Sequence, residues 1–216
     1  MTQSYFVPEL PVPSAVAVLA FLGTAFVLAA LGIASIVAFA HGKRRLAGKA
    51  AITAACAAAL YLGTLVAVSL ASPERVLGRG DRKYFCEIDC HLAYSLEESA
   101  RRAEGAAVPA RTIATVRTWF DEKTIAPFRG DAPLTPNPRV VYALDDDGNR
   151  YPPSSLEETP LNRSLRPGES YTTTFVFDLP PGVRRPRLFL GDAPGIEIFV
   201  IGHESSLLHR KVYFGL

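Results

Sequence analysis

The stretch that decides the fold is AVAVLAFLGTAFVLAALGIASIVAFA over residues 15–40, then HGKRRLAGK over 41–49 and AAITAACAAALYLGTLVAVSLA over 50–71. The first and last of these segments contain no Asp, Glu, Lys or Arg. Each is longer than the ~20 apolar residues that a helix needs to cross the hydrocarbon core of a bilayer. We therefore predict a two-helix transmembrane hairpin over residues 1–71, with spans at about 15–40 and 50–71.

The short connection over 41–49 is basic, and Lys and Arg in short loops stay on the cytoplasmic side. We expect a multi-pass protein of the bacterial inner (cell) membrane, with its N-terminus and everything after Ala71 outside the cytoplasm. The lipid bilayer is thus the first expected partner. A cleaved signal peptide explains the first span poorly, because residues 1–14 contain Glu9 and no Lys or Arg.

Charge and motifs limit the classes of function. The 216 residues include 23 Lys and Arg and 21 Asp and Glu, and both signs are mixed along the part after Ala71. A nucleic-acid surface needs a concentrated basic face, so nucleic acid is not an expected partner. Neither Gly-x-Ser-x-Gly nor His-Glu-x-x-His occurs, and no enzyme activity is expected.

The rest of the chain is typical of an all-β domain. Residues 72–83 contain Pro73, Gly78 and Gly80 and are predicted to be a linker. Residues 84–216 hold short runs of alternating or β-branched residues between Gly- and Pro-containing turns, which indicates an extracytoplasmic antiparallel β-sandwich. The predicted strands are 84–96, 112–120, 139–144, 150–151, 171–179, 187–190, 196–201 and 211–214; the predicted loops are 98–104 (or a helical turn), 121–138 and 152–166.

Two local patterns support these strands. Asp145-Asp146-Asp147-Gly148-Asn149 lies between two of them, and Asp-Gly favours a tight hairpin turn. The acidic run does not have the spacing of an EF-hand calcium loop, because Ser154 stands where that loop has a Glu. In the strand 171–179 the alternation predicts that Tyr171, Phe175 and Phe177 pack inward.

The segment Leu165-Arg166-Pro167-Gly168-Glu169-Ser170, with the strand that ends at Phe177-Asp178-Leu179-Pro180, resembles the telokin-like, immunoglobulin-like extracellular domains of bacterial surface proteins. In that family a Pro-Gly-Glu turn leads into a strand ending in Phe-x-x-Pro, and an Asp-rich, Gly-containing hairpin followed by Tyr comes earlier. The resemblance implies an immunoglobulin-like fold. It concerns turns, so it implies no chemistry, and a two-helix anchor departs from the usual single anchor.

One cluster, Cys86-Glu87-Ile88-Asp89-Cys90-His91, contains side chains that could bind a metal or take part in redox chemistry. If 84–96 is one strand, Cys86 and Cys90 both face the core and lie ~13 Å apart at ~3.3 Å per residue. That separation is too long for a disulfide. We predict the strand, with a disulfide across a turn at 86–90 as the first alternative.

A metal site in the same turn is the second alternative. Thiolates of Cys86 and Cys90 with the imidazole of His91 favour copper or zinc, and a folded-back loop could add His203 and His209. Covalent haem c is the third, although its motif has one residue fewer between the cysteines. The two-helix topology also resembles subunit II of haem–copper oxidases, but the position of the pair and the lack of a Met near it do not fit that family's dicopper centre.

We therefore predict a membrane-anchored extracytoplasmic accessory module without catalytic activity or cofactor, which binds or helps to assemble a larger membrane or envelope complex. The alternative is a metal-binding (copper or zinc) or redox accessory protein that uses Cys86, Cys90 and His91.

Overall fold

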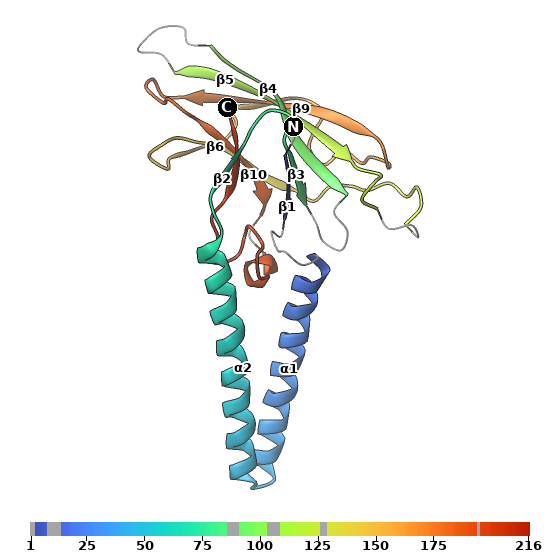
Figure 1. The fold of residues 1–216 in the computed structure, drawn as a ribbon, viewed down its shortest axis with the longest axis vertical. Coiled ribbons are helices and arrows are strands. Elements are labelled where there is room, and N and C mark those ends of the chain that lie inside the picture. Colours follow the sequence, from blue (N-terminus) through green and yellow to red (C-terminus); the bar gives the residue numbers. More distant parts are fainter. Residues whose placement is uncertain (1–2, 8–13, 86–90, 103–108, 126–128, 194) are drawn as a thin grey trace.

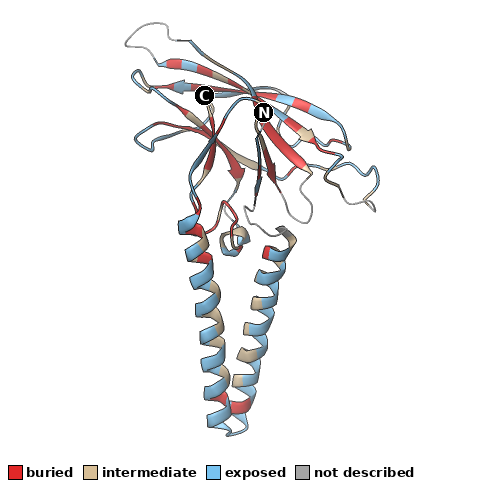
Figure 2. Ribbon diagram, in the orientation of Figure 1, coloured by how far each residue is buried: buried red, intermediate tan, exposed pale blue. Residues whose placement is uncertain are grey.

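Two long helices and two β-sheets make up the computed structural model of the chain (Figure 1). Helix α1 is Ser14–Ala40 and α2 is Arg44–Ala71; they form a hairpin whose closed end lies away from the sheets. Both are long and apolar enough to cross a membrane, as predicted. Most of their residues are exposed in Figure 2, whereas buried residues gather in the sheets. The structure describes residues 3–7, 14–85, 91–102, 109–125, 129–193 and 195–216.

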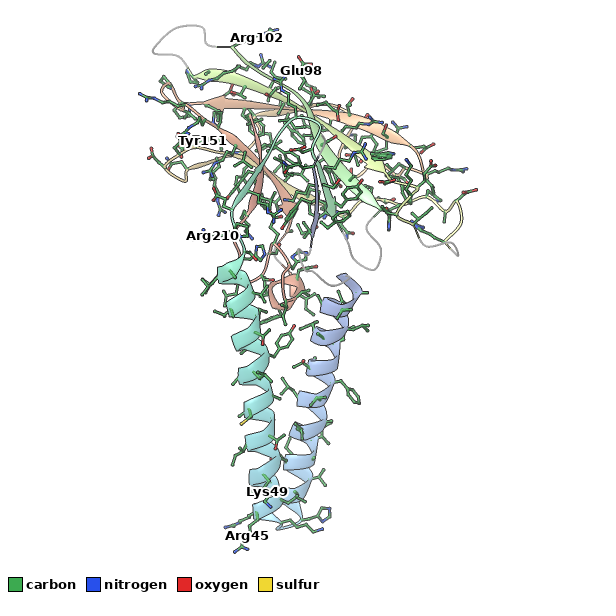
Figure 3. All side chains as sticks on the ribbon, viewed as in Figure 1. Arg45, Lys49, Glu98, Arg102, Tyr151 and Arg210 are labelled. Atoms are coloured by element: carbon green, nitrogen blue, oxygen red, sulfur yellow. The ribbon has the colours of Figure 1, made fainter. Side chains whose placement is uncertain are left out.

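The turn between the helices is shorter than the predicted connection. Helix α2 already begins at Arg44, so the basic residues Arg45 and Lys49 lie on its first turns, at the tip of the hairpin in Figure 3. Gly42 takes a φ of 73° in the turn, a backbone conformation that residues with a Cβ rarely adopt. The positive charges of the hairpin therefore gather at the end farthest from the sheets.

The strands form two sheets that face each other. Sheet A has six strands in the order β1-β3-β4-β5-β9-β8, and sheet B has five in the order β2-β11-β10-β6-β7. Sheet A comprises β1 Ser4–Val7, β3 Arg82–Phe85, β4 Leu92–Arg102, β5 Ala110–Phe120, β9 Ser170–Leu179 and β8 Ser155–Glu158. Sheet B comprises β2 Arg75–Leu77, β11 Val212–Gly215, β10 Arg187–Asp192, β6 Arg139–Leu144 and β7 Arg150–Tyr151.

Both sheets are mixed, which corrects the predicted antiparallel immunoglobulin-like sandwich. Strand β1 pairs with β3 in parallel, and β2 pairs with β11 in parallel; the other pairs are antiparallel. The parallel strands are the segments next to the hairpin: β1 precedes α1 and β2 follows α2. The predicted linker 72–83 therefore contains a strand of sheet B, and residues assigned to the hairpin segment supply a strand of sheet A.

A single large core fills the space between the sheets. Its buried side chains come from both, and β1 contributes Tyr5 and Val7, which are 2% and 0% exposed. The predicted inward face of β9 is confirmed, since Tyr171, Phe175 and Phe177 are all buried. Because one core takes side chains from residues 5 to 214, the strands on both sides of the helical hairpin belong to one folded unit.

The predicted single strand over 84–96 is wrong. Strands β3 and β4 pair antiparallel with Phe85 opposite Leu92, so the chain reverses its direction between these two residues. The reversal also changes which side chains face inward: Phe85 joins the core, whereas Tyr84 packs on the other side of sheet A with Ala93 and Trp119. Residues 86–90, with both cysteines, lie outside the described residues.

Other elements differ from the sequence-based expectation in extent or type. Strand β4 continues to Arg102, where a loop or helical turn was predicted from residue 98, and β8 lies within the predicted loop 152–166. The predicted strand 196–201 is instead a 3₁₀ helix, η1, over Ile196–Phe199. The predicted hairpin at 145–149 is confirmed: β6 and β7 pair antiparallel, and Gly148 has a φ of 86°.

Candidate functional site

A buried ion pair connects the two sheets. Lys83 of β3 and Glu204 of the loop before β11 are 0% and 1% exposed, and Lys83 Nζ lies 2.6 Å from Glu204 Oε2. The ammonium group also donates to the carbonyls of Leu190 (2.7 Å) and Val212 (3.2 Å), both in sheet B. Its three donors thus have three acceptors. Burial lowers the pKa of Lys83, and the Glu204 carboxylate opposes that shift.

Glu204 also fixes the loop that carries it. Its Oε1 accepts the N–H of Val212 at 2.6 Å, and its backbone carbonyl accepts a hydrogen bond from Lys211 Nζ. Burial lowers the pKa of Lys211. One carboxylate therefore binds both Lys83 on sheet A and the first residue of β11 on sheet B, which closes the loop on the sandwich.

A second ion pair continues the network. Arg139 of β6 pairs with Asp192 at the end of β10, and its Nε donates to the Tyr94 hydroxyl of sheet A at 3.2 Å. The Arg139 guanidinium also lies 3.9 Å from the centre of the Phe85 ring, a cation–π contact. Sheets A and B are thus joined a second time, by a cation on sheet B.

His203 links the two pairs. Its Nδ1 accepts the N–H of Ser205 at 3.0 Å, so the neutral ring carries its proton on Nε2, which lies 3.6 Å from Asp192 Oδ2. Burial lowers the pKa of His203 to about 4, although the neighbouring Glu204 carboxylate acts in the opposite direction. The imidazole is therefore neutral at neutral pH.

The network holds a segment that touches both helices. We call residues 195–211 the hairpin-contact segment; it includes η1, which lies between the sheets and the open end of the hairpin in Figure 1. The carbonyl of Phe199 accepts a hydrogen bond from the Tyr61 hydroxyl of α2 at 2.6 Å. The Phe199 ring stacks on the Phe21 ring of α1, with 6.4 Å between the ring centres. On α2, Leu65 and Ser69 are 1% and 0% exposed and follow Tyr61 at intervals of four, so they lie on the same helix face.

The outer face of sheet A carries a second group of aromatic and charged side chains. Outward positions of adjacent strands lie opposite one another: Phe6 pairs with Tyr84, and Ala93 with Trp119. Phe6 stacks on Tyr84 at 4.7 Å and stays 41% exposed, and the Arg82 guanidinium lies 4.3 Å from the centre of the Trp119 ring. A shallow hollow of about 160 Å³ lies on this face, lined by Gly80, Arg82, Ala93, Ser95, Glu97, Arg117 and Trp119.

The histidines predicted as metal ligands have the following surroundings. His91 is partly buried, with its ring 4.9 Å from that of Phe120. His203 belongs to the ion network, and His209 Nδ1 donates to the carbonyl of Arg210 at 2.6 Å. Among the described residues, no three His, Cys, Asp or Glu side chains come together as metal ligands would. Because Cys86 and Cys90 lie outside that part of the chain, the thiolate site stays a prediction.

The sequence-based interpretation missed Lys83, Glu204, Arg139 and Asp192. Alternation in Arg82-Lys83-Tyr84-Phe85 would have placed Lys83 inward with Phe85, but the segment was assigned to a linker and to a strand of the opposite parity. An aromatic residue two positions from a lysine is too common a pattern to identify a buried ion pair. The pair is recognised only in the three-dimensional structure, where Glu204 lies beside Lys83.

Comparisons with known proteins give one distant neighbour. No protein-family model and no curated protein matches the chain, so the telokin-like family is not confirmed. Among solved structures the chain is similar to MPT63, a secreted protein from Mycobacterium tuberculosis, with 11% identity and a TM-score of 0.40 over 68% of this chain and 100% of that chain.

Proposed function

We propose that this protein is a membrane-anchored extracytoplasmic accessory module that binds or assembles a larger membrane or envelope complex and has no catalytic activity. Both helices cross the bacterial inner membrane, and the basic tip of the hairpin lies in the cytoplasm, as the positive-inside rule favours. The observation that carries the proposal is that the chain enters the hairpin from a strand of sheet A and leaves it into a strand of sheet B.

This connection favours a supporting role over a free tether. Strand β1 pairs with β3 from Ser4 opposite Arg82 to Val7 opposite Phe85, so the residues before α1 and after α2 lie on one side of any bilayer that the helices cross. The hairpin-contact segment adds a third connection through Phe199. A domain joined to its anchor at three places keeps its orientation to the membrane, which suits a module that presents one face to a partner.

The outer face of sheet A is the contact surface that we propose. Trp, Tyr and Arg are enriched among the residues that dominate protein–protein binding energy. Arg82, Arg117 and Trp119 supply two of these three residue types around the hollow, with exposed Phe6 on the adjacent strand β1. The partner is therefore a protein with an acidic or apolar contact patch.

Site-specific photo-crosslinking in native membranes tests this proposal. A photo-reactive amino acid at Arg117, on the outer face, is compared with one at Glu157, an exposed position on the edge strand β8. We expect one discrete adduct from position 117 that Trp119→Ala abolishes, and no adduct of the same mass from position 157. Absence of an adduct at 117, or identical adducts at both positions, would contradict the proposed surface.

A metal-binding or redox accessory role is the second candidate. The observation that favours it is the antiparallel pairing of Phe85 with Leu92. This pairing excludes one continuous strand over residues 84–96, which was the geometry that predicted ~13 Å between the two cysteines. Copper or zinc is the ion class that two thiolates with His91 would take.

Thiol counting and elemental analysis of the purified full chain separate the two candidates. A metal-binding role predicts bound copper or zinc that Cys86→Ser with Cys90→Ser removes, together with a higher melting temperature when the metal is added. Three freely titrating thiols, those of Cys86 and Cys90 in addition to that of Cys56 on α2, without bound metal and without a melting shift with Cu(I), Zn(II) or reductant, would eliminate this second candidate.

A further inference from the structure

The hairpin-contact segment leaves four large apolar side chains exposed. Ile196 and Phe199 lie on η1 and are 64% and 45% exposed, and Leu207 and Leu208 are 60% and 58% exposed. Leu208 has a φ of 64°, a left-handed conformation that is strained for a leucine. The fold thus keeps an unfavourable backbone conformation at a position that places an apolar side chain outward.

The segment lies beside the helices and not beyond their ends. Tyr61, which donates to the Phe199 carbonyl, precedes Ala71 at the end of α2 by ten residues, or about 15 Å at 1.5 Å per residue. Phe21, which stacks on Phe199, follows the start of α1 by about 10 Å on the same scale. A hydrocarbon core is ~30 Å thick. In helices that cross such a core, these contacts lie at the depth of the outer leaflet.

Apart from Arg210, the charged side chains of the segment are less exposed than these four apolar side chains. Glu204 is buried against Lys83, and His203 is neutral because burial lowers its pKa to about 4. Glu197 has a buried carboxylate oxygen and lies over Gly195, where a Cβ would collide with it. Arg210 is the exposed cation next to the tips, beside the upper end of α2 in Figure 3.

We propose that the hairpin-contact segment is a membrane-insertion element: Ile196, Phe199, Leu207 and Leu208 enter the outer leaflet of a phospholipid bilayer beside α1 and α2. Arg210 extends to the headgroups, where long basic side chains pair with phosphate. The inference rests on the proposed function, because it requires that the two helices cross the membrane. The bilayer is the occupant because the segment is already bound to both candidate spans through Phe199.

Quenching by brominated lipid tests the insertion on the full chain. The protein is reconstituted into phosphatidylcholine–phosphatidylglycerol vesicles with or without brominated acyl chains, and Trp119→Phe removes the natural tryptophan. Leu207→Trp is the test position, Leu60→Trp on α2 reports the spanning helix, and Leu156→Trp on β8 is the matched exposed leucine in the sheets. Far-ultraviolet circular dichroism checks that each variant is folded. If Trp119→Phe does not fold, Trp119 is kept in all variants, and the emission of the natural chain is subtracted from theirs.

We expect roughly twofold or greater quenching at positions 207 and 60 and little at 156, because inserted apolar side chains lie ~5–10 Å inside the headgroup boundary. Quenching at 60 without quenching at 207 would overturn the insertion and leave the membrane anchor intact. Absence of quenching at position 60 would overturn the anchor, and the insertion with it. Equal quenching at 156 and 207 would contradict a specific insertion element.

Discussion

Lys83 Nζ lies 2.6 Å from Glu204 Oε2, and neither side chain reaches solvent. The pair unites three parts of the molecule: β3 of sheet A, β10 and β11 of sheet B through their carbonyls, and the hairpin-contact segment through Glu204 itself. The two-sheet core thus holds the segment that touches the helices.

Lys83→Met should therefore destabilise the protein by about 3–5 kcal/mol, because it leaves the Glu204 carboxylate buried without a counter-charge. The double variant Lys83→Met, Glu204→Leu should recover much of that loss, since it removes both charges. Urea unfolding of the full chain in detergent measures both values. A loss below about 1 kcal/mol for the single variant is the behaviour of an exposed ion pair and would show that the network is open to water.

Acid should destabilise the fold through His203. Its pKa is about 4 in the folded protein and has the ordinary value of 6.5 in the unfolded chain, so the unfolded chain binds more protons between these values. The contribution is present in full above pH 6.5 and is lost as the pH falls toward 4, by about 3 kcal/mol at 1.36 kcal/mol per pH unit. His209 adds the same sign, because burial lowers its pKa too.

The matched control for this pH dependence is His203→Asn, whose amide oxygen can accept the Ser205 N–H without titrating. Melting temperatures from pH 7.5 to 4.5 should fall less steeply in this variant than in the natural chain. Identical slopes would show that other groups account for the acid sensitivity.

Val7→Asp should weaken the β-domain although residue 7 precedes the first helix. Val7 is 0% exposed in the shared core, so a carboxylate there costs roughly 3 kcal/mol or more. Phe6→Asp, at the neighbouring exposed position of β1, is the control and should cost less. Urea unfolding, monitored by Trp119 fluorescence, compares the two variants. Equal stability of Val7→Asp and the natural chain would show that β1 is not part of the sheet.

Strong periodic signals in the sequence predicted the parts of the fold that depend on local patterns. The two helices follow from their long uncharged runs, and the alternation of β9 correctly assigned Tyr171, Phe175 and Phe177 to the core. The Asp-Gly turn between β6 and β7 was predictable because Gly148 needs a positive φ.

The elements that were missed depend on partners far away in the sequence. Strands β1 and β2 have four and three residues, too few for an alternation to be recognised, and each gains its position from one parallel neighbour. Ile196–Phe199 has β-branched residues typical of a strand, but it forms a 3₁₀ helix in contact with α1 and α2, and tertiary context overrides such propensity. No local pattern identifies Glu204 as the partner of Lys83.

In the topology that we propose, the residues before α1 and the β-domain lie together on the side of the membrane opposite the hairpin tip. Labelling with a membrane-impermeant maleimide in intact spheroplasts tests it most directly, with single cysteines at Ser4, Glu98 and Lys49 in a background in which the three natural cysteines are replaced. All three positions are exposed. We predict that positions 4 and 98 react before lysis and position 49 only after it. Reaction of position 49 in intact spheroplasts would contradict this topology. Reaction of only one of positions 4 and 98 before lysis would contradict it too.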